Sequence, residues 1–182
     1  MRRDAAALQI PWCEAYKTGV ICYSPMQAGL LTDRFRVERV TCMATDDWRR
    51  GAAEFNPSNL DRNIALRDAL KPIAQRHRTS VSSVAIAWVL SWPGVTAAIV
   101  GARSPEQVDG WIGAGNLELG PAALDEIARN QASRRGFRSI DTELGIRRTQ
   151  VGRIERQFES IETAATLIKC RNLILIFPAL PD

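Results

Sequence analysis

Two short apolar runs, each ending in small and turn-forming residues, most constrain how this chain can fold. Residues 20–23 and 96–100 have the length and apolar character of buried strands. Between them, apolar residues recur at helical spacing over residues 60–77 and again over residues 81–92. Strands that alternate with helices in this way pair in parallel. The sequence therefore predicts an α/β fold in which the loops after both strands meet at one end of the sheet.

Further helices are expected around these strands. Thr79 and Ser80 are expected to cap the helix over residues 81–92, and Pro72 to bend or restart the helix that precedes it. Capping and breaking residues predict three more helices, over residues 4–17, 104–112 and 121–128.

One long connection is expected to be irregular. Residues 32–59 are rich in Asp, Asn, Gly and Pro, and they predict a loop with one short helix near residues 47–55. A loop of that length is usually functional or a lid.

The composition excludes several classes of protein. The chain has 182 residues, of which 46% are hydrophobic and 24% charged, as expected for a globular protein with its own core. One histidine and four cysteines without a CxxC pair exclude most zinc-binding patterns and favour a reduced protein. No stretch approaches the ~18 apolar residues of a membrane span, and the first residues do not resemble a signal peptide. We therefore expect a cytoplasmic protein without membrane contact.

The chain changes character near residue 130. Polar residues 131–136 interrupt the strand–helix rhythm, so we expect one domain over residues 1–130 and a basic, mainly helical tail over residues 131–182. The tail holds nine Lys and Arg against six Asp and Glu. Its apolar run at residues 173–177 does not continue the strand–helix pattern, although it is able to cover an exposed sheet surface.

Part of the tail looks like a DNA-binding motif. Residues 140–156 resemble the turn and second helix of a helix-turn-helix, with Gly145 in the turn and Gln150 and Arg153 facing DNA. Residues 133–142 hardly supply the first helix that this motif needs. We favour an added amphipathic or out-of-context segment over nucleic-acid binding.

Three motifs in a fixed order point to a known family. The first is Tyr23-Ser24-Pro25-Met26-x-x-Gly29-Leu30-Leu31-Thr32, after the first strand. The second is the apolar helix 84–90 with Pro93-Gly94-Val95, and the third is Ile99-Val100-Gly101-Ala102-Arg103-Ser104-Pro105-Glu106-Gln107. Over residues 4–128 the chain resembles the aldo-keto reductases, (β/α)8 barrels that reduce aldehydes and ketones with NADPH. The resemblance implies a partial TIM barrel, made of its last strands and helices, with an extra mainly helical C-terminal tail.

The resemblance also implies a grip on NADP by the loops after both strands. Tyr23 would stack on the nicotinamide, Arg34 would lie over the pyrophosphate, and Arg103 would bind the 2′-phosphate that distinguishes NADP from NAD. Trp111 replaces a residue of the family's adenine end and would offer its ring to adenine. The implied cofactor-binding residues are Tyr23, Ser24, Pro25, Met26, Gln27, Gly29, Leu30, Arg34, Gly101, Arg103 and Gln107.

The family's proton-transfer residues have no counterpart in the sequence. The family uses a tyrosine, a lysine, an aspartate and a histidine on earlier strands of the barrel. None of the tyrosines, lysines and histidine of this chain falls in such a motif: Tyr16, Tyr23, Lys17, Lys71, Lys169 and His77. We therefore expect an enzyme fragment that is inactive alone.

Partners follow from the same resemblance. A completed barrel would take NADPH and a small aldehyde or ketone, and exposed strand edges would favour self-association. A non-catalytic nucleotide-binding module and a DNA-associated protein are the alternatives.

Overall fold

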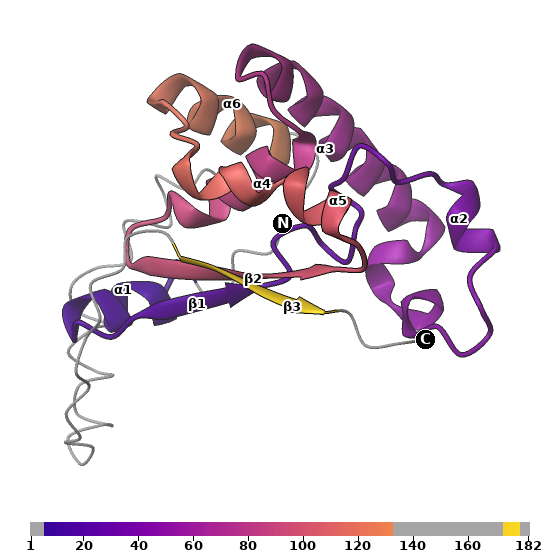
Figure 1. Ribbon diagram of the computed structural model, residues 1–182, viewed down its shortest axis with the longest axis horizontal. Coiled ribbons are helices and arrows are strands. Elements are labelled where there is room, and N and C mark those ends of the chain that lie inside the picture. The colour runs from indigo at the N-terminus through magenta and orange to yellow at the C-terminus, as the bar shows by residue number, and fades with distance from the viewer. Residues whose placement is uncertain (1–5, 133–172, 179–182) are drawn as a thin grey trace.

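A three-stranded parallel sheet forms the base of the molecule. The computed structural model describes residues 6–132 and 173–178. The strands are β1 (Val20–Tyr23), β2 (Val95–Ala102) and β3 (Leu173–Pro178), in the order β1-β2-β3. All neighbours are parallel, and Tyr23 and Leu175 flank Ile99 from the two sides. The two strands expected from the sequence are therefore present and adjacent (Figure 1).

The third strand corrects an expectation. The apolar run near residue 173 does not stand apart from the strand–helix pattern but extends the sheet as β3. Pairing with β2 satisfies backbone groups that an isolated apolar run would leave without partners. Residues 140–156, which resemble part of a helix-turn-helix, lie outside the described residues.

Helices gather over one face of this sheet. In Figure 1, α3 (Pro57–Arg76), α4 (Val81–Leu90), α5 (Pro105–Asp109) and α6 (Pro121–Ala132) lie above the strands, while α1 (Gln9–Ala15) lies beside the start of β1. The remaining helical pieces are α2 (Glu38–Thr41) and the 3₁₀ turns η2 (Trp48–Gly51), η3 (Ala53–Phe55) and η4 (Ile112–Asn116). The irregular loop expected over residues 32–59 is therefore real, and it contains three short helical turns rather than one.

The central helix, α4, is buried on nearly all sides. One face packs against α3 and α6 through residues such as Val84 and Trp88, and the opposite face packs against β2 through Ile86 and Leu90. Apolar residues all round the helix account for this, because such a helix needs cover on every side. The Ser80 hydroxyl accepts a hydrogen bond from the Ser83 N–H at 3.0 Å, so of the two expected capping residues Ser80 is the N-cap.

Several helix boundaries differ from expectation, and for three of the helices the structure gives a physical reason. The first helix ends at Ala15 rather than at Lys17, because Lys17 adopts a left-handed φ of 53°. The expected restart at Pro72 does not occur, since α3 is one 20-residue helix whose neighbouring residues Leu70 and Ile73 are fully buried. The helix expected over residues 104–112 stops at Asp109, because Trp111 turns into the core.

The strand β1 is less buried than its sequence suggests. Ile21 is 51% exposed and Tyr23 81% exposed. Within the described residues β1 pairs only with β2, so one edge and much of one face stay open. The expectation of a buried strand is wrong for β1 in this structure.

Gly94 makes the tight approach of α1 to the start of β2 possible. Its φ is +83°, and a Cβ built there would lie 3.1 Å from Ile10 Cγ2 and 3.2 Å from Glu14 Cβ. We expect Gly94→Ala to lower the free energy of unfolding by about 1–3 kcal/mol, through backbone strain and crowding. Gly51→Ala is the matched control, since a Cβ there meets nothing within 4 Å. Urea unfolding measures both, and equal loss in the two variants would contradict this account of Gly94.

Candidate functional site

The loop after β1 folds back on itself in left-handed steps. Ser24, Gln27, Ala28 and Gly29 have φ values of 54°, 51°, 53° and 93°. The turns are closed by backbone hydrogen bonds, including Gln27 N–H to Ser24 O at 3.0 Å and Gly29 N–H to Met26 O at 3.2 Å. Gln27 and Ala28 are consecutive non-glycine residues in this conformation, which costs free energy that the surrounding structure must supply, and such strain is concentrated at functional sites.

This loop forms one wall of a pocket at the carboxyl ends of β1 and β2. The pocket has a volume of about 710 Å³. Nine of the eleven cofactor residues implied by the sequence line it, from two loops about seventy residues apart. They are Tyr23, Ser24, Pro25, Met26, Gly29, Arg34, Gly101, Arg103 and Gln107.

The other two implied residues do not line the pocket. Leu30 has 0% exposure and packs in a cluster with Phe35, Met43 and Phe55, and its N–H donates to Gln27 O at 3.1 Å. The Gln27 carbonyl thus helps to close the turn of the loop after β1. The position of an apolar residue in a motif does not show whether its side chain contacts a ligand or the core. The sequence therefore did not distinguish Leu30 from the pocket-lining residues of the same motif.

The pocket is rich in arginine. Arg34, Arg39, Arg49 and Arg103 line it against the carboxylates of Asp33 and Glu106. The Asp33 carboxylate accepts a hydrogen bond from the Val81 N–H at 3.0 Å, at the start of α4. The balance of charge favours a polyanionic ligand.

Several lining residues were not found by sequence reasoning. Arg39, Trp48 and Arg49 lie in the long loop over residues 32–59, and only the length of that loop signalled a functional role. The polar and charged members outside the implied set are Thr32, Asp33, Arg39, Arg49, Ser80, Ser82 and Glu106.

Arg49 forms an ion pair with Asp47 within the long loop. Its Nε donates to Asp47 Oδ1 at 2.9 Å, and its backbone N–H donates to the same atom at 3.0 Å. These bonds, the side-chain one foremost, lower the pKa of Asp47 to about 2, and Arg103 contributes to the same direction. The long loop therefore brings a carboxylate that is charged at neutral pH near Arg103.

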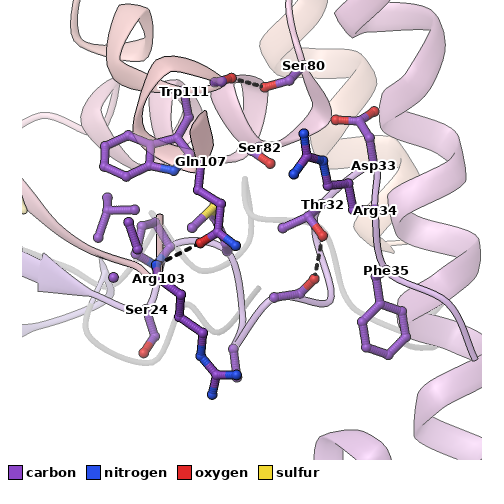
Figure 2. A pocket seen from close by; sticks show the side chains of 18 of the residues that line it. Ser24, Thr32, Asp33, Arg34, Phe35, Ser80, Ser82, Arg103, Gln107 and Trp111 are labelled. Atoms are coloured by element: carbon purple, nitrogen blue, oxygen red, sulfur yellow. Dashed lines mark hydrogen bonds between the residues drawn. The ribbon is translucent and has the colours of Figure 1, made fainter. Parts of the chain in front are cut away.

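The loop after β2 is held by its own side chains. Gln107 Oε1 accepts a hydrogen bond from the Arg103 N–H at 2.8 Å (Figure 2). The Ser104 hydroxyl beside Glu106, aided by the nearby Arg34, lowers the pKa of that carboxyl. Arg103 and Gln107 are therefore brought together, as expected from their spacing.

Trp111 does not take the role that its position suggested. It is 4% exposed and packs with Ile86, Leu90 and Val100, so its ring faces are in the core although it reaches the pocket wall. The Ser80 hydroxyl holds the preceding carbonyl, Gly110 O, at 2.8 Å. Stacking of Trp111 on adenine is not supported, because the residue is a packing anchor between α4 and β2.

The donor set fits a phosphorylated dinucleotide. A Cβ at Gly29 or Gly101 would meet no protein atom within 4 Å, so both glycines border open space in the pocket. Arginines and a turning backbone supply the donors that phosphates need, and Tyr23 supplies an exposed aromatic ring. Among residues 6–132 and 173–178, no group of three His, Cys, Asp or Glu side chains is arranged to hold a metal ion. The helices of this part of the chain are also too short or too polar to cross a bilayer.

Known proteins are similar to this chain over most of the described residues. The model of the aldo/keto reductase family matches residues 1–131. An uncharacterized oxidoreductase of Mycobacterium tuberculosis is 32% identical over 144 residues, which cover 76% of this chain and 41% of the relative. A probable aldo-keto reductase 1 of Glycine max is 28% identical over 125 residues, covering 69% of this chain and 35% of that protein.

A solved structure is similar over the same part. The glycerol dehydrogenase of Gluconobacter oxydans matches with a TM-score of 0.67 at 26% identity, over 76% of this chain and 41% of the dehydrogenase. The chain thus spans about two fifths of the length of these relatives. The expected α/β fold with part of a TIM barrel is confirmed by this similarity together with the parallel strands. The chain belongs to the aldo/keto reductase family.

Proposed function

We propose that this chain binds NADP(H) in the pocket between the loops after β1 and β2. The observation that carries the proposal is that nine implied contact residues, Arg34 and Arg103 among them, line one pocket together with two further arginines, Arg39 and Arg49. The exposed Tyr23 ring would support the nicotinamide, and the backbone of the loop after β1, with Arg34, would hold the pyrophosphate. When bound, the nicotinamide supplies or accepts hydride.

Arg103 gives the proposed site a preference for NADP over NAD. It lies in the pocket at the end of β2, beside Gln107 and within electrostatic reach of Asp47. A planar guanidinium forms paired hydrogen bonds with a phosphate, and NAD lacks the 2′-phosphate. The side chain therefore contributes to one cofactor and not to the other.

We further propose that the chain does not reduce carbonyl compounds by itself. Of the described tyrosines, lysines and histidine, only Tyr23 lines the pocket. Tyr16 stacks on Trp12, Lys71 pairs with Asp68 at 2.7 Å, and His77 ends α3. A proton donor for the carbonyl oxygen must then come from further barrel strands, and a barrel completed in this way would act on a small aldehyde or ketone.

Location and domain organisation remain part of this proposal. We place the protein in the cytoplasm on the strength of its cysteines, since Cys13, Cys22 and Cys42 are free thiols. Residues 1–130 form the barrel segment and residues 131–182 a tail of separate origin. The open edge of β1 favours association with a strand from another chain or copy.

Cofactor preference tests the role of Arg103. We expect Arg103→Met to raise the dissociation constant for NADPH by about 10- to 100-fold, as the loss of charge-assisted hydrogen bonds implies. Binding of NADH should change by less than about threefold, because it has no phosphate at that position. Titration of the cofactor's fluorescence measures both, with Arg62→Met on the exposed side of α3 as control. An equal effect on NADPH and NADH would refute the 2′-phosphate assignment, and no NADPH binding by the wild-type chain would refute the cofactor proposal.

Catalysis is tested separately with the wild-type chain. Loss of NADPH absorbance is followed with a small aldehyde in excess, and we expect no oxidation above the rate without protein. Steady oxidation that Tyr23→Phe abolishes would contradict the proposed inactivity and would identify Tyr23 as the proton donor.

A further inference from the structure

Arg34 is carried by a loop that is tied to the fold on both sides of it. On one side, the Asp33 carboxylate accepts a hydrogen bond from the Val81 N–H at 3.0 Å. On the other side, the Phe35 carbonyl accepts one from Arg67 at 2.8 Å. Figure 2 shows the Arg34 side chain extending toward Ser82, between Asp33 and Phe35. The backbone of Arg34 is thus fixed through both of its neighbours.

Arg67 is an unusual residue to find inside α3. It is only 9% exposed, and its Nε and Nη2 donate to Asp68 Oδ1 at 3.1 Å and 2.9 Å. Its remaining donor, Nη1, reaches across 32 residues of sequence to the Phe35 carbonyl. Burial of a guanidinium lowers the stability of a protein unless its N–H groups form hydrogen bonds. The hydrogen bonds to Asp68 and to the Phe35 carbonyl are therefore required for Arg67 to be buried here.

The tie through Asp33 has an electrostatic consequence as well. Asp33 lines the same pocket as Arg34, and an unpaired carboxylate there would repel a phosphate. The Asp33 carboxylate accepts its hydrogen bond from Val81, the first residue of the ten-residue helix α4. The carboxylate therefore lies at a helix N-terminus, where the helix dipole stabilises its negative charge. The Asp33 carboxylate is thereby engaged by the backbone of α4, and Glu106 is the other pocket carboxylate that interacts with Arg34.

We propose that Arg67 and Asp33 are positioning residues, which hold Arg34 in place to contact the cofactor's phosphates. The inference rests on the proposed cofactor site and adds two residues to it that sequence motifs did not reveal. Neither of them needs to touch the cofactor. A loop that is free to move loses conformational freedom when its arginine binds a ligand, and a backbone that is already fixed reduces that cost.

A double-mutant cycle separates positioning from general stability. In the wild-type background, Arg67→Met should weaken NADPH binding by about 3- to 30-fold, the range of couplings between neighbouring residues. In the Arg34→Met background, the same change should have an effect of less than about twofold, because no Arg34 remains to be positioned. The measurement is NADPH fluorescence titration of the full chain, with folding of each variant checked by circular dichroism.

Matched variants keep the test decisive. Arg76→Met, on the exposed side of α3, should leave NADPH binding unchanged, and Arg67→Lys should restore part of it by keeping a donor near Phe35 O. If Arg67→Met does not fold, Asp33→Ala replaces it in the same cycle with the same expectation. Equal losses in both backgrounds would overturn the inference while leaving the cofactor site intact. A wild-type chain that binds no NADPH would overturn the proposed function and this inference together.

Discussion

The burial of α4 between the sheet and the outer helices is the constraint on which the rest of the structure depends. Its residues Val84 and Trp88 hold α3 and α6, and its residues Ile86 and Leu90 hold β2. Removal of this much apolar surface from water is the main source of stability in a small α/β unit. Both clusters meet only because one short helix is apolar on every side.

The same helix also organises the pocket. Its first turn carries Ser80 and Val81, which bond to Gly110 and Asp33 respectively. The loop after β1 and the loop after β2 are therefore both attached to one helix end, although they are far apart in sequence. In a barrel, a buried helix that is bonded to two binding loops keeps these loops in fixed positions relative to each other.

The sequence predicted the features that depend on local chemistry. The strands β1 and β2, the Ser80 cap and the convergence of the two motif loops followed from periodicity and turn residues, and the structure has them, whereas β3 was not expected. Leu30 and Trp111 were read as ligand contacts because motif position does not say which way a side chain faces, and packing placed both in the core. Arg39 and Arg49 were missed because they lie in a long irregular loop. No short-range sequence pattern predicts the course of such a loop, so it did not show that these side chains line the pocket. The exposure of β1 depends on which strands surround it, and this is a property of the sheet rather than of residues 20–23.

The order of the strands determines at which edge of the sheet a further strand can pair. Within the described residues, β2 has a parallel neighbour on each side, whereas β1 has one neighbour only. Any further strand can therefore add at β1 without disturbing what is present, but on the other side it must follow β3 or displace it. A closed barrel requires every strand to have two neighbours. Closure through β2 itself would require the departure of β3, whereas closure that keeps β3 would have to continue from the outer edge of that strand.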